Sequence, residues 1–172
     1  IRRGVCLGRQ PHGMEYVMTT TAILFPGQGA QHVGMGREFS EKLSACRELY
    51  DRASTVLGYD LAALSFEGPI EKLTVSAHAQ PAIFVASVAA YTALKERFPA
   101  LEPFAMAGLS SGEWTALHLA GALSFDATLK VLEARGRFMQ EACEHTPGAM
   151  MSVIGADESQ LRALCEAGGA EM

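Results

Sequence analysis

Ser110 is the residue whose neighbours best equip it for covalent chemistry. It lies in residues 108–112, GLSSG, between a short apolar stretch at residues 104–107 and a helix-compatible stretch at residues 115–120. A Gly-x-Ser-x-Gly segment between a strand and a helix is typical of a nucleophile elbow, a sharp turn that exposes the serine hydroxyl. The flanking glycines fit, because larger side chains two residues from the serine would collide with the strand or the helix. The segment therefore indicates a nucleophilic serine.

The same segment also fits a plain strand-to-helix turn, because Gly and Ser are common at such joints. At the start of a helix, free N–H groups and the helix dipole would favour negative charge developing near Ser110. Glu113 does not distinguish the two interpretations, since an acidic residue in the first turn of any helix interacts favourably with the helix dipole. The motif alone leaves both interpretations open.

The elements that would position Ser110 alternate between strands and helices. The pattern predicts strands at residues 20–25, 104–107 and 150–155, and helices at residues 41–57, 61–66, 81–98, 115–120, 124–144 and 158–167. Gly58 is expected to end the first helix and Ser124 to cap the fifth. Within that fifth helix, Leu129, Leu132 and Phe138 are expected to face inward. This alternation predicts an α/β fold with a mostly parallel sheet covered on both faces.

Composition excludes several classes of protein. The chain has 172 residues, 49% hydrophobic and 19% charged, which suits one globular domain, and no apolar run is long enough to span a bilayer. The net charge of −5 and the absence of a Lys/Arg run argue against nucleic acid as a partner. The four cysteines are widely spaced without a metal-ligand pattern, which predicts reduced thiols, a cytoplasmic location and no metal.

Residues 1–17 differ in kind from the rest of the chain. They hold three arginines against one acid and show no hydrophobic periodicity. We expect them to be a disordered or non-native leader, with Met14 or Met18 as the natural start. A transit peptide is the alternative, although serine is missing from this stretch.

Further segments favour the interpretation of Ser110 as a nucleophile. Residues 25–31, FPGQGAQ, with residues 33–36, VGMG, resemble the segment that opens the acyltransferases of fatty-acid and polyketide synthesis, in particular the malonyl-CoA:acyl carrier protein transacylases. Residues 133–140, EARGRFMQ, resemble their RGxxMQ segment, and residues 80–87, QPAIFVAS, resemble the helix that lines the core behind their site. The resemblance runs from about residue 20 to the end of the chain, and several ordered segments are more specific than any one of them.

The resemblance implies a role for each matching residue. Ser110 would accept the acyl group, the backbone N–H groups of Gln28 and Ser111 would form the oxyanion hole, and Arg135 would bind the malonyl carboxylate. Gln28 and Leu109 would also border the substrate. The roles are physically reasonable, because glycines let a backbone amide approach a carbonyl closely and a guanidinium matches a carboxylate with two parallel hydrogen bonds. Taken alone, the loop could be ligand-free and Arg135 a solvated helix residue.

The resemblance also implies a division of the chain. Residues 18–146 would be the N-terminal part of an α/β-hydrolase-like large subdomain with a parallel sheet. Residues 147–172 would begin an inserted ferredoxin-like small subdomain, which is truncated here.

The chain departs from the family pattern at three places. Leu109 stands where the family has His, and Ser111 where it has Leu, although only the backbone N–H of Ser111 is needed. The family's base is a downstream His, expected beyond Met172 together with a Gln or Asn that helps hold the site. The five histidines present are poor substitutes; His118, for example, lies about 12 Å along the helix axis from Ser110.

The predicted function is therefore transfer of a malonyl group from malonyl-CoA to the phosphopantetheine thiol of acyl carrier protein, through a seryl ester and without a cofactor. One alternative is an acyltransferase domain of a polyketide synthase. Another is a serine esterase, which would have no use for Arg135 at the acyl pocket. A third is a non-catalytic fragment that binds acyl-CoA or the carrier protein. We expect these 172 residues alone to be inactive.

Overall fold

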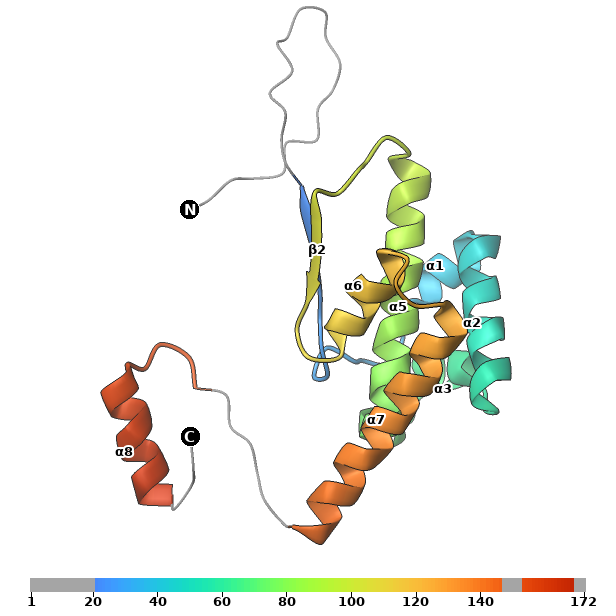
Figure 1. The fold of residues 1–172 in the computed structure, drawn as a ribbon. Coiled ribbons are helices and arrows are strands. Elements are labelled where there is room, and N and C mark those ends of the chain that lie inside the picture. Colours follow the sequence, from blue (N-terminus) through green and yellow to red (C-terminus); the bar gives the residue numbers. More distant parts are fainter. Residues whose placement is uncertain (1–20, 147–152, 169–172) are drawn as a thin grey trace, which may run out of the picture.

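A computed structural model describes residues 21–146 and 153–168. Its two strands, β1 (Ala22–Phe25) and β2 (Ala105–Gly108), pair in parallel, with Ala22 opposite Ala105 and Phe25 opposite Gly108 (Figure 1). Because the strands are parallel and in register, both end at the same edge of the sheet. The segments that follow them are therefore brought together although they are far apart in the sequence.

Helices make up most of the described chain. They are α1 (Arg37–Lys42), α2 (Ser44–Leu57), α3 (Leu61–Glu67), α4 (Ile70–Thr74), α5 (Ser76–Arg97), α6 (Gly112–Leu119), α7 (Phe125–His145) and α8 (Glu158–Gly168). None of them is both long and apolar enough to cross a membrane. A helix-rich chain with a small parallel sheet belongs to the α/β class that the sequence predicts.

Helix α5 is the centre of the packing. It runs beside the strands and contacts α2, α6 and α7, so its first two thirds are buried almost all round (Figure 1). The largest fully buried apolar side chains include Phe84 of α5 and Tyr50, Leu61, Leu129 and Leu132 of other helices. Each buried Leu or Phe of this kind stabilises the fold by about 1.5–3 kcal/mol relative to exposure. The core therefore lies between helices, on one side of the sheet.

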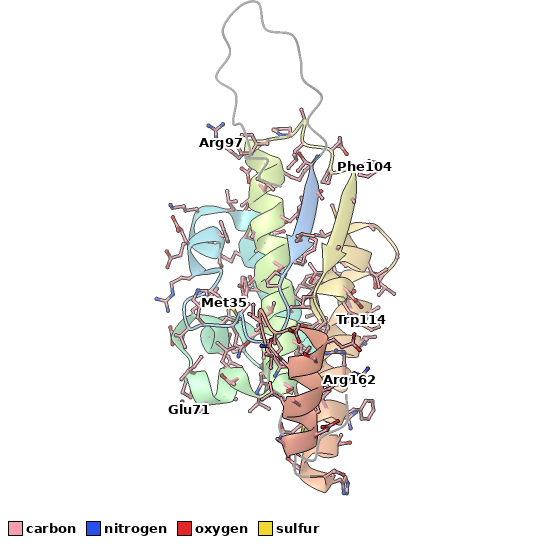
Figure 2. All side chains as sticks on the ribbon, turned by 90° about the vertical axis from the view of Figure 1, so that its left-hand side faces the viewer. Met35, Glu71, Arg97, Phe104, Trp114 and Arg162 are labelled. Atoms are coloured by element: carbon pink, nitrogen blue, oxygen red, sulfur yellow. The ribbon has the colours of Figure 1, made fainter. Side chains whose placement is uncertain are left out.

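The opposite face of the sheet is open within the described residues. Side chains alternate between faces along a strand, and Leu24 (75% exposed), Ala105 and Ala107 all lie on the open side. Phe104, just before β2, is also exposed (Figure 2). The prediction of a sheet covered on both faces is therefore wrong for the part of the chain that the structure describes.

Several predicted helix boundaries need correction. The helix expected at residues 41–57 is two helices, because Leu43 is extended (φ −125°, ψ 119°) between α1 and α2. Gly58 ends α2 in the left-handed conformation (φ 74°), as predicted. Helix α5 starts at Ser76 rather than at Pro81. Pro81 lies inside the helix and has no N–H to donate to the carbonyl four residues before it. The short α4 was not predicted.

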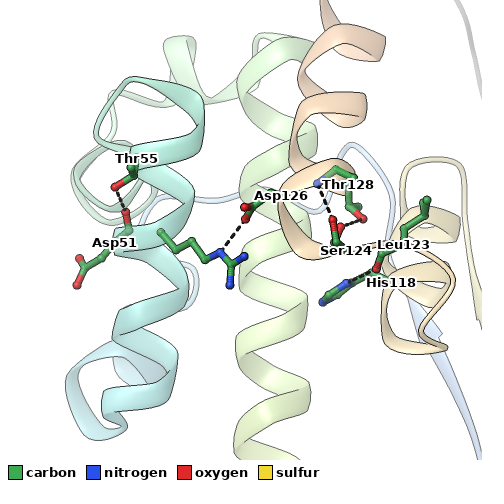
Figure 3. Close-up of polar contacts among 9 residues, drawn as sticks. Asp51, Thr55, His118, Leu123, Ser124, Asp126 and Thr128 are labelled. Atoms are coloured by element: carbon green, nitrogen blue, oxygen red, sulfur yellow. Dashed lines mark hydrogen bonds and ion pairs between the residues drawn. The ribbon is translucent and has the colours of Figure 1, made fainter.

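Helix α7 begins as the sequence predicts. The Ser124 hydroxyl accepts a hydrogen bond from the N–H of Ala127 at 3.2 Å, which caps the helix (Figure 3). Leu129 and Leu132 are buried as predicted. Phe138 is not: its side chain is exposed, so the expectation that it faces inward is wrong.

Only some of the elements predicted for the C-terminal part of the chain fall within the described residues. Helix α8 confirms the helix predicted at residues 158–167. Residues 153–155 form no strand, and the rest of the strand predicted at 150–155 lies outside the described residues. The leader expected at residues 1–17 also lies outside them, and the proposed subdomain division stays a prediction.

Helices α5 and α7 lie in close backbone contact at Gly136. A Cβ atom added there would lie 2.4 Å from the carbonyl carbon and oxygen of Ser76 and 2.6 Å from the Cα of Ala77. These are backbone atoms, so the two helices can approach only because residue 136 has no side chain. The contact places the first turn of α5 against the middle of α7.

Gly136→Ala is therefore expected to lower the free energy of unfolding by about 1–3 kcal/mol, since the clash outweighs the better helix propensity of Ala. Gly168→Ala in α8 is the matched control, because a Cβ there meets nothing within 4 Å. Urea unfolding followed by circular dichroism measures both. A Gly136→Ala protein as stable as the control would contradict the packing described here.

Candidate active site

The site forms where β1 and β2 end. The N–H of Leu109, after β2, donates to the carbonyl of Phe25, the last residue of β1, at 3.0 Å. Gly27 lies against the same turn, because a Cβ there would be 2.4 Å from the Leu109 oxygen and 3.4 Å from the Ser110 Cβ. The glycine-rich loop after β1 is thus in direct contact with the serine turn.

Ser110 has the backbone geometry of a nucleophile elbow. Its φ is +53°. Among the described residues, no other residue except glycine has a positive φ. A Cβ on Gly108 would lie 1.9 Å from the carbonyl carbon of Gly112, and one on Gly112 would lie 2.4 Å from the Phe25 oxygen. The expectation that both flanking residues must be tiny is confirmed. Left-handed backbone at a serine costs energy that the surrounding contacts must offset.

Two backbone amides, one in the serine turn and one in the adjoining loop after β1, form no hydrogen bond within the described residues. The N–H groups of Gln28 and Ser111 donate to no group within residues 21–146 and 153–168. Ser111 sits just before α6, with its side chain 2% exposed and its hydroxyl without a described partner. Free amides next to a nucleophile are suited to hold an oxyanion.

Arg135 reaches Ser110 from α7. Its Nη2 donates to the Ser110 Oγ at 3.1 Å, and its Nη1 donates to the Oε1 of Gln80 at 2.7 Å. The Nε2 of Gln80 in turn donates to the Oε1 of Gln28 at 3.2 Å, and the Nε2 of Gln28 donates to the Oγ of Ser76 at 2.9 Å. A continuous chain of hydrogen bonds therefore joins the loop after β1, the start of α5, α7 and the serine.

An apolar groove of about 470 Å³ lies beside Arg135. Trp114 of α6 and Phe138 of α7 form part of its wall (Figure 2 shows Trp114). The groove explains why Phe138 is exposed rather than in the core. Its other lining residues are Val131, Ala134, Met139 and Ala142.

None of the described histidines hydrogen-bonds Ser110. His118 contacts the Leu123 carbonyl through Nδ1 at 3.0 Å (Figure 3). Its ring also packs edge-on against the rings of Phe84 and Phe125. His78 contacts the Lys72 carbonyl, and His32 contacts that of Ala30. These rings are engaged elsewhere, and Arg135 has no acceptor for a proton.

The structure brings together most of the residues that the sequence singled out. Ser110, Gln28 and Arg135 meet in one network, and the amide of Ser111 adjoins it. Leu109 is next to Ser110 and 73% exposed, so it borders the open side of the candidate site.

Sequence reasoning missed Gln80 and Ser76. The sequence resemblance places Gln80 only in the helix that lines the core behind the site. The available signal was an amide side chain within an otherwise apolar segment, because such a group needs a partner when buried.

Comparison with known proteins agrees with this geometry. The family model described as acyl transferase domain matches residues 23–168. The malonyl CoA-acyl carrier protein transacylase of Haemophilus influenzae is 43% identical over 149 residues, which are 87% of this chain and 48% of that protein. The chain thus spans about half the length of this curated relative.

Solved structures give the same result. An acyl carrier protein S-malonyltransferase from Vibrio cholerae matches with a TM-score of 0.78 and 38% identity, over 87% of this chain and 48% of that one. A malonyl-transacylase in complex with its type II polyketide synthase acyl carrier protein matches with a TM-score of 0.75 and 35% identity, over 87% of this chain and 48% of that one. With a family model that covers most of its length, this chain belongs to the acyl transferase domain family.

Proposed function

We propose that the domain to which this chain belongs moves a malonyl group from malonyl-CoA to the phosphopantetheine thiol of acyl carrier protein. The observation that supports this most directly is the 3.1 Å hydrogen bond from Arg135 Nη2 to Ser110 Oγ. A guanidinium this close to the nucleophile can hold the carboxylate at the far end of a short acyl group, because malonyl places its carboxylate a few bonds from the carbonyl that Ser110 attacks.

The reaction would proceed in two transfers. Ser110 Oγ attacks the thioester carbon and loses its proton to a base that the described residues do not supply. The oxyanion forms next to the free amides of Gln28 and Ser111, and collapse expels the CoA thiolate and leaves a seryl ester. The carrier-protein thiol then attacks the ester, and Ser110 regains its proton. No bond change in this sequence needs a metal or a redox cofactor.

Two alternatives differ from this proposal in substrate. A serine esterase would use the same elbow and amides but gains nothing from a guanidinium at the acyl end. A polyketide synthase acyltransferase would use the same residues, and the structural relative found with a type II polyketide carrier protein supports carrier protein as the acceptor class in either pathway. We also propose a cytoplasmic location, because the four cysteines of the sequence lie far apart and form no CxxC pair.

Arg135→Ala should lower kcat/KM for malonyl-CoA by about tenfold to a hundredfold in the complete domain and spare acetyl-CoA, which brings no carboxylate. Arg135→Lys should restore only part of the loss, because an ammonium cannot form the two-pronged contact. Arg137→Ala, whose side chain pairs with Glu141 on the same helix, is the control. The measurement is the ratio of kcat/KM for malonyl-CoA over acetyl-CoA. An unchanged ratio in Arg135→Ala would remove the main support for malonyl as substrate.

The 172-residue chain alone should acylate Ser110 slowly when mixed with malonyl-CoA, because a serine without a base is a weak nucleophile. Intact-mass spectrometry over time detects the malonyl adduct, and Ser110→Ala identifies the site. Rapid and stoichiometric labelling of Ser110 would show that the chain contains its own base, contrary to the positions of the described histidines.

A further inference from the structure

Gln80 is the one fully buried polar side chain that touches the guanidinium of Arg135 within the described residues. It is 0% exposed, and its amide uses both ends: Oε1 accepts from Arg135 Nη1 at 2.7 Å, and Nε2 donates to Gln28 Oε1 at 3.2 Å and to the Met139 sulfur at 3.3 Å. A buried amide with this many partners has a fixed orientation, because turning it would place donors against donors.

The backbone around Gln80 is also fixed. Gln80 lies one turn into α5, and the close contact of Gly136 with Ser76 and Ala77 holds this turn against the segment of α7 that bears Arg135. Ser76 belongs to the same hydrogen-bond network, because its hydroxyl accepts from the side-chain amide of Gln28. The acceptor for Arg135 is therefore positioned by the packing of two helices and not by a loop.

Gln80 differs from the usual partner of an arginine in being neutral. No Asp or Glu forms an ion pair with Arg135 within residues 21–146 and 153–168. A carboxylate at position 80 would compensate the guanidinium charge, and an incoming carboxylate would then compete with it. A neutral acceptor orients one N–H edge of the guanidinium and leaves the charge available.

We propose that Gln80 is a positioning and specificity-determining residue, which aims Arg135 at the acyl end of the Ser110 site through an uncharged hydrogen bond. The inference rests on the proposed function, since it concerns the selection of acyl groups that bear a carboxylate. It predicts that the identity of residue 80 sets the preference for malonyl over acetyl without contacting the reacting atoms.

The test measures kcat/KM for malonyl-CoA and acetyl-CoA in the complete domain. Gln80→Leu removes the acceptor and should lower the malonyl/acetyl ratio by about tenfold or more. Gln80→Glu keeps the size and the acceptor, adds a charge and loses the donor to Gln28, and it should lower the ratio at least as much. Gln140→Leu is the control, because its exposed amide bonds only to Glu144 on its own helix. It should leave the ratio unchanged.

A double-mutant comparison separates positioning from general damage to the fold. In an Arg135→Ala background, Gln80→Leu should have no further effect on the ratio, because its role is exerted through Arg135. An equal fall in both backgrounds would overturn the proposal, as would a wild-type ratio in Gln80→Glu. If Gln80→Leu does not fold, the Gln80→Glu ratio decides the question.

The same data keep this inference distinct from the proposed function. If Arg135→Ala lowers the ratio but the Gln80 variants do not, Gln80 has only a packing role and the malonyl assignment stands. If the wild-type domain shows no preference for malonyl and Arg135→Ala changes nothing, the proposed function itself fails.

Discussion

The active-site region depends on close contact between backbones at glycine residues. Gly27 lies on the Leu109 carbonyl, Gly108 lies against Gly112, and Gly136 lies on the Ser76 carbonyl. At each contact a methyl group would occupy the space of a backbone atom. A hydrogen-bond network with donor–acceptor distances near 3 Å tolerates only small displacements, so these contacts determine whether Arg135, Gln80 and Ser110 can meet at all.

The electrostatics of the site follow from this packing. The guanidinium of Arg135 donates to the amide oxygen of Gln80 and to the hydroxyl of Ser110, whereas Arg137 on the same helix forms an exposed ion pair with Glu141. Neutral acceptors satisfy the geometry of a guanidinium without cancelling its charge. The charge of Arg135 is therefore left uncompensated by these contacts, which is the basis for proposing that an acyl group with a carboxylate binds beside Ser110.

Local signals in the sequence were sufficient for turns and helix ends marked by glycine and for the helix start capped by serine. The GLSSG turn, the end of α2 at Gly58 and the cap at Ser124 were each predicted from a few adjacent residues. The contact of Gln80 with Arg135 joins residues 55 positions apart, and no local pattern encodes it.

The errors have specific physical causes. Leu43 adopts an extended conformation inside a run with helical periodicity, so periodicity alone could not reveal the break between α1 and α2. Phe138 has the spacing of a core residue but faces a groove between α6 and α7. One face of the sheet is open within the described residues, and strands of four residues carry too little hydrophobic pattern to indicate which face is covered.

The in-register pairing of β1 and β2 has an evolutionary consequence. Adding or removing one residue inside β2 would shift Ser110 along the strand by about 3.3 Å and exchange the two faces of every residue after the change. Length variation of that kind would separate the nucleophile from the loop after β1 in a single step. Homologous genes should therefore accumulate insertions in connections such as the one between Arg97 and β2, while the span from Ala105 to Gly112 keeps its length.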